Sequence, residues 1–252
     1  MIKKRLIPLM LSSGDVLVKG KNFGQHRVVG RMESMLRIWS DQEIDELLLL
    51  DISSESESNS FLRKVELASS VVNFPITVGG KIGNLEYARE LLKSGADKIS
   101  ICSKATEDLS FVENLASEFG SQAVVIIVDY KWVNGSPEIY SKNASVQILM
   151  DMRKYLTELQ DFGAGEIVLQ NIEQEGSKRG LDERIVPYVE DLIAVPLILS
   201  GGAGNFDHLK GALQHESVSG VACGSLFYFG DNSPIRARSY LRSSGIAMRK
   251  AR

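Results

Sequence analysis

Two stretches of the chain, residues 75–84 and 196–205, follow nearly the same pattern. Each contains a short apolar run, a cluster of glycines and an asparagine, followed by an acidic residue, Glu86 or Asp207. A second matching pair, residues 44–52 and 165–172, is separated by almost the same interval of about 120 residues. Solenoid repeats are shorter, about 20–50 residues. The sequence therefore predicts a duplicated half of roughly 120 residues. Glycine-rich turns between a strand and a helix bind anions through backbone amides. Two related turns indicate a substrate with a phosphate at each end.

Apolar runs alternate with stretches of helical periodicity along the whole chain. The predicted strands are residues 5–11, 46–52, 76–78, 98–101, 123–129, 166–171, 197–200 and 220–223, and helices are expected at 85–93, 109–119, 150–162 and 183–193. Eight such units in 252 residues predict a single (β/α)₈ TIM barrel of two half-barrels, spanning residues 1–252. The alternative, an open doubly wound sheet, would call for Gly-x-Gly-x-x-Gly after the first strand, which is absent. Residues 236–252 are expected to form a solvated terminal helix.

Composition excludes several classes of function. The net charge of −3 gives no basic excess for nucleic acid. No apolar run approaches the roughly 18–20 residues of a membrane span, and the first residues lack a signal-peptide pattern, so we expect a cytoplasmic protein. Cys102 and Cys223 predict buried thiols rather than a disulfide framework. His26, His208 and His215 are scattered, so neither a metal nor a cofactor is predicted.

Eight short strings occur in order along the chain and support a resemblance to one family. They are KRLIP (4–8), KGKNF (19–23), IDEL (44–47), LDI (50–52), GADK (95–98), GSQAVV (120–125), GAGEI (163–167) and SGGAG (200–204). Through them the chain resembles the cyclase subunit of imidazole glycerol phosphate synthase, the HisF-type member of the histidine-biosynthesis barrels. The resemblance implies an enzyme subunit that accepts ammonia from a partner glutaminase and joins it to a bis-phosphorylated nucleotide.

The resemblance also implies a pair of carboxylates on opposite strands, one acting as general acid and one as general base. Asp129 occupies one of these places. Leu11 occupies the other, where the family has an aspartate, and a leucine cannot transfer a proton. Asp51, at the end of the second strand, is the predicted second catalytic residue, and Asp15 is a further source of a carboxylate.

Phosphate-binding residues carry over to both glycine-rich turns. The C-terminal set is Gly176, Ser200, Gly201, Gly202, Gly204, Gly224 and Ser225. The N-terminal set is altered: Gly80, Lys81 and Ser103 stand there, with Lys81 in place of a third glycine. Lys81 either obstructs the anion or binds it through its ammonium group. Lys19 is also assigned to phosphate binding, and it lies in the loop where the family has a mobile lid over the substrate.

At the opposite face, the resemblance implies a ring of charges through which ammonia enters the barrel. Its residues are Arg5, Glu46, Lys98 and Glu166, and Asp97 is expected at the interface with the glutaminase.

Together these features predict the HisF-type synthase subunit of a glutamine-dependent amidotransferase, acting on a phosphorylated, nucleotide-linked acceptor. Because Leu11 breaks the acid–base pair, a different acceptor is expected, and the chain resembles those paralogues of the family that convert an acetamido to an acetamidino group on a surface-polysaccharide sugar. The alternatives are an active cyclase of histidine biosynthesis, or a non-catalytic subunit that conducts ammonia to a third, amidotransferase protein.

Overall fold

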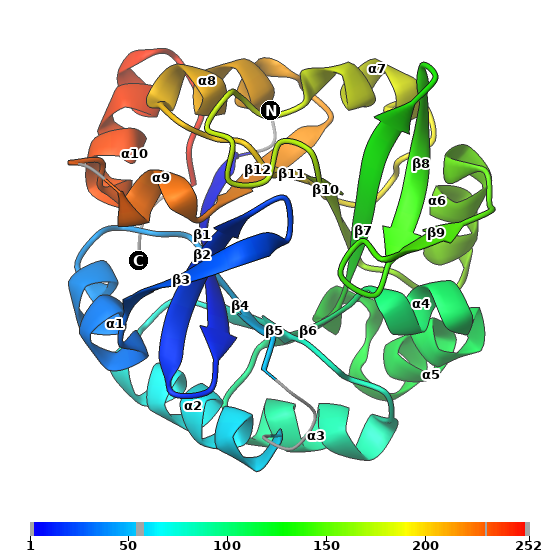
Figure 1. Cartoon of the computed structure of the whole chain (residues 1–252), viewed down its shortest axis with the longest axis horizontal. Coiled ribbons are helices and arrows are strands. Elements are labelled where there is room, and N and C mark those ends of the chain that lie inside the picture. Colours follow the sequence, from blue (N-terminus) through cyan, green and yellow to red (C-terminus); the bar gives the residue numbers. More distant parts are fainter. Residues whose placement is uncertain (1–2, 54–57, 230, 250–252) are drawn as a thin grey trace.

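Eight parallel strands close into a barrel (Figure 1). The structure is a computed structural model that describes residues 3–53, 58–229 and 231–249. The barrel strands are β1 (Arg5–Ser13), β4 (Leu47–Asp51), β5 (Ile76–Gly79), β6 (Lys98–Ile101), β7 (Val124–Val133), β10 (Glu166–Asn171), β11 (Leu197–Ser200) and β12 (Val218–Cys223). They pair in the order β10-β11-β12-β1-β4-β5-β6-β7, and β10 also pairs with β7. The predicted (β/α)₈ barrel is confirmed, and the open-sheet alternative is wrong.

Helices surround the strands (Figure 1). They are α1 (Met32–Ser40), α2 (Ser58–Val71), α3 (Leu85–Lys93), α4 (Ser103–Glu107), α5 (Leu109–Phe119), α6 (Met152–Asp161), α7 (Val186–Val189), α8 (Phe206–Gln214), α9 (Ser225–Tyr228) and α10 (Pro234–Ser243), with 3-10 turns η2 (Ser121–Ala123) and η3 (Glu183–Ile185). In the described part of the chain, no helix is long and apolar enough to cross a membrane.

The helix expected at residues 183–193 is wrong in extent. Helical structure there consists of η3 followed by α7, which ends at Val189. The chain must then turn back to enter β11 at Leu197, and Pro196 disfavours the helical conformation in the residue before it. The terminal helix is α10, but it is not fully solvated, because Arg238 is only 1% exposed.

Two hairpins that the sequence analysis did not predict follow the C-terminal ends of β1 and β7. The first is β2 (Val16–Lys21) with β3 (Gly24–Gly30), and the second is β8 (Ser136–Ser141) with β9 (Val146–Ile148). Both lie in front of the barrel in the view of Figure 1. They therefore belong to the face on which the barrel strands end.

The duplicated halves share their turn geometry. Asn84 and Asn205 cap the helices α3 and α8, and each side chain accepts a hydrogen bond from the backbone N–H three residues further on. Gly80 and Gly201, at equivalent places before these helices, have φ of 112° and 93°. These values lie in the left-handed region that favours glycine.

Side chains on the barrel strands alternate between the interior and the helices. The interior contains an apolar cluster of Ile7, Leu9, Leu48, Val125, Ile127, Val168, Ile198 and Ala222. Leu11, Leu50 and Cys102 pack against this cluster and are partly buried. Leu11, Leu50 and Cys102 lie toward the C-terminal strand ends, whereas the charged residues Arg5, Glu46, Lys98 and Glu166 lie at the N-terminal end of the same interior.

Candidate functional site

A ring of four charged side chains closes the N-terminal end of the barrel. Arg5 Nη1 lies 3.0 Å from Glu46 Oε2 and 2.9 Å from Glu166 Oε2. Lys98 Nζ contacts the same two oxygens at 3.0 and 3.2 Å. Two cations thus bridge two carboxylates, and the ring is balanced in charge. The structure brings together the four residues predicted for an ammonia gate; the gating role itself stays a prediction.

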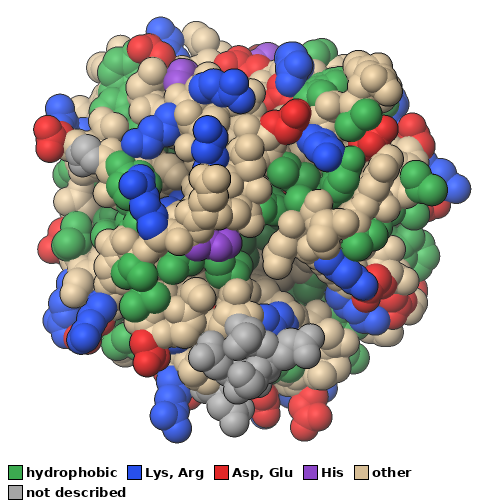
Figure 2. Space-filling model, viewed as in Figure 1, with side chains coloured by type: hydrophobic (Ala, Val, Ile, Leu, Met, Phe, Trp, Pro, Cys, Tyr) green, Lys and Arg blue, Asp and Glu red, His purple; other side chains and the backbone are tan. Residues whose placement is uncertain are grey.

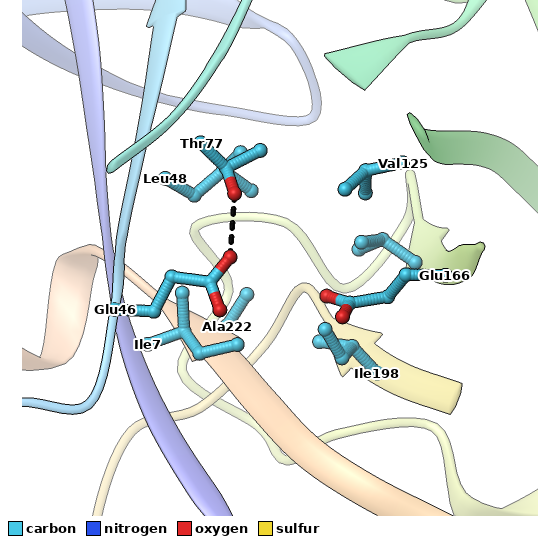
Figure 3. Close-up of a pocket in the computed structure, with 9 residues that line it drawn as sticks. Ile7, Glu46, Leu48, Thr77, Val125, Glu166, Ile198 and Ala222 are labelled. Atoms are coloured by element: carbon cyan, nitrogen blue, oxygen red, sulfur yellow. Dashed lines mark hydrogen bonds between the residues drawn. The ribbon is translucent and has the colours of Figure 1, made fainter. Parts of the chain in front are cut away.

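A cavity lies against this ring inside the barrel (Figure 3). Figure 3 shows the carboxyl groups of Glu46 and Glu166 pointing toward each other, with Thr77 beside Glu46. The Thr77 hydroxyl donates a hydrogen bond of 2.5 Å to Glu46 Oε1. The remaining lining is apolar: Ile7, Leu48, Val125, Val168, Ile198 and Ala222. The free space is small, about enough for one water-sized molecule.

Asp129 lies at the other end of the barrel interior, on β7. Its side chain is buried, with 8% of the residue exposed. Burial raises the pKa of Asp129 to about 7, an effect that a hydrogen bond from Cys102 partly offsets. Cys102 Sγ donates to Asp129 Oδ2 at 3.4 Å. The site therefore holds a carboxyl that can accept or release a proton near neutral pH.

The structure does not bring Asp51 and Asp129 together. Leu50 packs against the interior cluster, so Asp51, the next residue on β4, faces away from the barrel axis. The Asp51 carboxylate accepts hydrogen bonds from the backbone N–H and hydroxyl of Ser53, at 3.2 and 2.5 Å. Lys81 Nζ lies 3.4 Å from Asp51 Oδ2. Asp51 thus offsets the charge of the lysine that was predicted to bind phosphate.

The two glycine turns differ at one equivalent position. Gly202 has φ of 106°, and a Cβ there would collide with the carbonyl of Gly180. Lys81 stands at the matching place in the other half and adopts φ of 56°. Glycine is therefore required in the C-terminal turn, while the N-terminal turn accommodates a side chain.

The C-terminal turn is partly engaged by the protein itself. The Gly204 amide, predicted to bind phosphate, donates to His208 Nδ1 at 3.1 Å. Ser200 and Ser225 are buried, and the Ser200 hydroxyl donates to Gln170 at 3.4 Å. An anion would have to compete with His208 for the Gly204 donor.

Lys19 lies on β2 of the first hairpin, in a segment predicted to be a mobile loop. The side chain is buried against Gly224, and burial lowers its pKa. Lys19 Nζ is 3.8 Å from Glu175 Oε1, and the backbone N–H of Phe23 donates to Glu175 Oε2 at 3.3 Å. Glu175 therefore holds the hairpin against the loop that follows β10.

The remaining predicted site residues have partners of their own. Gly176 packs closely against the backbone of Gly20. The Ser103 hydroxyl accepts a hydrogen bond from the backbone N–H of Lys142 at 2.9 Å. Asp97 is exposed and directly precedes β6, and the backbone N–H of Ile76, the first residue of β5, donates to its carboxylate at 2.8 Å. Its role in binding a partner stays a prediction.

The sequence analysis missed Asp182, a buried acid beside the site. It accepts hydrogen bonds at 2.5–3.1 Å from side chains of Tyr130, Trp132, Asn171 and Arg184. Tyr130 and Trp132 extend β7 beyond Asp129, and Asn171 ends β10. Asp182 therefore ties the C-terminal ends of two neighbouring strands together. No local sequence pattern signals this role, because Tyr130, Trp132 and Asn171 lie on two barrel strands outside the segment that carries Asp182.

Figure 2 views the face on which the strands end. Hydrophobic side chains surround a hollow near its middle, and Lys and Arg side chains lie around the rim. Among residues 3–53, 58–229 and 231–249, no group of three or more His, Cys, Asp and Glu side chains could hold a metal ion.

A closed (β/α)₈ barrel with a buried acid at the C-terminal strand ends has the architecture of the TIM-barrel enzymes, which place their active sites there. The model of the Histidine biosynthesis protein family matches residues 5–233. Imidazole glycerol phosphate synthase subunit HisF of Dictyoglomus turgidum is 39% identical over 251 residues, 99% of both chains. The subunit of the same name from Chlorobaculum parvum is 35% identical, over 99% of this chain and 100% of its own. The chain belongs to the histidine biosynthesis protein family, as a HisF-type member.

Proposed function

We propose that this chain is the synthase subunit of a glutamine-dependent amidotransferase, taking ammonia from a separate glutaminase subunit and adding it to a phosphorylated acceptor. The observation that carries the proposal is the charge-balanced ring of Arg5, Glu46, Lys98 and Glu166, with a cavity of mostly apolar lining against it. Asp129 lies at the far end of the same interior. Along the barrel, the ring, the cavity and Asp129 follow one another in the order in which a small nucleophile would enter, pass through and react.

The lining of the barrel interior favours neutral ammonia over ammonium. A water-sized molecule fits the cavity, and ammonia is of that size. An ammonium ion would lose its hydration in an apolar passage, at a cost of several kcal/mol or more. Passage therefore selects the form that has a free lone pair, which is the nucleophile.

Two acceptors are favoured by different observations. The full-length relatives, at 35–39% identity, favour the imidazole glycerol phosphate reaction for which they are named. Leu11 favours another phosphorylated acceptor, because an apolar residue stands where that reaction needs a second proton-transfer group. A polysaccharide sugar as acceptor has no support in these relatives. A subunit that only conducted ammonia would have no use for a buried acid such as Asp129.

The nitrogen source tests the proposal. The chain is combined with its glutaminase, and product formation is measured with glutamine and with ammonium salt. Replacing Lys98 with methionine should lower the glutamine-driven rate while leaving the ammonium-driven rate nearly unchanged. Lys154→Met, an exposed site with 71% of the side chain accessible, is the matched control and should alter neither rate. Equal loss with both nitrogen sources would argue against a gate.

Complementation distinguishes the two acceptors. A host that lacks its own HisF and receives this chain should grow without histidine only if the chain catalyses the cyclase reaction. If Leu11 is the obstacle, Leu11→Asp should raise cyclase activity by about 10²–10⁴-fold, the usual contribution of a general acid or base. Growth at the normal rate with the unmodified chain would exclude a changed acceptor.

A further inference from the structure

Cys102 and Asp129 stand at the C-terminal ends of neighbouring barrel strands. In the pairing of β6 with β7, Ile101 lies opposite Ile126, and Cys102 directly follows Ile101. We propose that Cys102 is a positioning residue for Asp129: its thiol holds one carboxyl oxygen and leaves the other directed to the acceptor. The catalytic meaning of this contact rests on the proposed function, whereas the contact itself can be tested without it.

The hydrogen bond distinguishes the two carboxyl oxygens. Cys102 Sγ donates to Oδ2 at 3.4 Å, and within the described residues no side chain is hydrogen-bonded to Oδ1. Leu11 and Leu50 pack against the same interior cluster as Cys102, and Gln170, which lies opposite Asp129 on β10, accepts a hydrogen bond from Ser200. A carboxyl in such surroundings takes its orientation from the few polar groups that reach it. Here that group is the thiol.

The thiol is suited to a donor's role rather than a nucleophile's. Burial, and then the charge of Asp129, raise the pKa of Cys102 well above its ordinary value. It therefore keeps its proton at neutral pH, and a protonated thiol is a poor nucleophile. A donor stabilises the ionised form of the carboxyl it contacts, opposing the burial that raises the Asp129 pKa.

Two tyrosines lie on elements that pack near this pair. Tyr140 of β8 pairs with Asp129 in the sheet, and its hydroxyl donates to Glu138 at 3.4 Å. Tyr155 of α6 is buried, and burial followed by the nearby Cys102 thiol raises its pKa. Neither hydroxyl is hydrogen-bonded to Asp129. Among these side chains, Cys102 is therefore the one whose replacement should directly change the pKa of the Asp129 carboxyl.

Carboxyl NMR on the whole chain tests this inference. The protein is labelled with ¹³C at the aspartate carboxyl carbons, and the Asp129 signal is assigned by its loss in Asp129→Asn. Cys102→Ala should raise the midpoint of the Asp129 titration by about 0.5–1 pH unit, the equivalent of one hydrogen bond. Cys102→Ser, which replaces the thiol with a stronger donor, should place the midpoint at or below that of the parent.

The second cysteine provides the matched control. Cys223 is also a free cysteine and is buried, and Cys223→Ala removes a thiol from β12 without touching Asp129. Its Asp129 midpoint should equal that of the parent. A midpoint unchanged in Cys102→Ala, or equal in the Ala and Ser variants, would overturn the inference. Backbone amide spectra show whether each variant is folded. If Cys102→Ala does not fold, Cys102→Ser tests the inference alone, and an Asp129 midpoint above that of the parent would then contradict it.

The NMR result is independent of substrate and so separates this inference from the proposed function. If the synthase reaction is not found, the Asp129 midpoint still reports whether the thiol acts on the carboxyl. Where activity is measured, the pH dependence of kcat should shift in the same direction as the NMR midpoint, with KM nearly unchanged. A Cys102→Ala variant that loses substrate binding but keeps its pH profile would indicate a purely structural role.

Discussion

Replacing Asp129 with asparagine should stabilise the protein, and by more at higher pH. Burial raises the pKa of Asp129 from its ordinary value of 3.8 to about 7. Between about pH 4 and pH 7 the folded state therefore holds a proton that the unfolded chain releases, so stability falls as the pH rises through this window. At about 1.36 kcal/mol per pKa unit, the full penalty reaches about 4 kcal/mol above pH 7. Asparagine does not ionise and avoids this penalty.

Urea unfolding at pH 4, 5, 6, 7 and 8 measures the effect, with the free energy extrapolated to zero denaturant. We expect Asp129→Asn to match the parent within about 1 kcal/mol near pH 4–5 and to exceed it by about 2–4 kcal/mol at pH 8, the lower figure allowing for the cost of burying the amide. Leu50→Met, a neutral change in the same cluster, is the control, and its difference from the parent should be independent of pH. A difference for Asp129→Asn that does not change with pH would refute the argument.

Three further substitutions test contacts elsewhere in the barrel. Arg5→Met leaves the two carboxylates of the charged ring with a single cation and should cost about 2–4 kcal/mol of unfolding free energy at pH 7; a loss below about 1 kcal/mol would contradict the ring's contribution. Asp182→Ala leaves several buried donors without an acceptor, so we expect a loss of about 2–4 kcal/mol and altered fluorescence of Trp132, whereas an unchanged emission spectrum would count against this role. Arg238→Met removes the guanidinium that lies 2.5 Å from the buried Asp45 carboxylate. Thermal unfolding should show a loss of about 3 kcal/mol in unfolding free energy, and no measurable loss would mean that the ion pair does not stabilise the fold.

The barrel was predictable because its signal lies within each strand. Near-continuous apolar runs, such as residues 123–129, identify buried parallel strands without knowledge of their neighbours. The hairpin of β2 and β3 carries no such signal, since most of β3 is exposed and its residues are mainly polar or glycine. Its position depends instead on Glu175, from a loop distant in sequence.

The candidate site was predictable only in part, for a related reason. The turn glycines and the ring charges are local features at strand ends, so their places follow from the strands. The pairs Cys102–Asp129 and Lys81–Asp51 depend on which strand ends meet and on which way each side chain points. The alternation along β4 already shows that Asp51 faces away when Leu50 faces inward, and this parity was the signal that could have separated the two aspartates.

The reaction proposed for the C-terminal end of the barrel interior requires proton transfer. If the interior carries neutral ammonia, bond formation with an electrophilic acceptor leaves a surplus proton on nitrogen, and a base must remove it. Asp129, with a pKa of about 7, is ionised in part of the population at neutral pH and can take that proton. A later step that must protonate a leaving group at the opposite strand would need a second acid, and Leu11 supplies none. Under the proposed function, the site would supply one acid–base group for amination, so the fate of the aminated product, rather than the entry of ammonia, is where this chain and a two-carboxylate cyclase should differ.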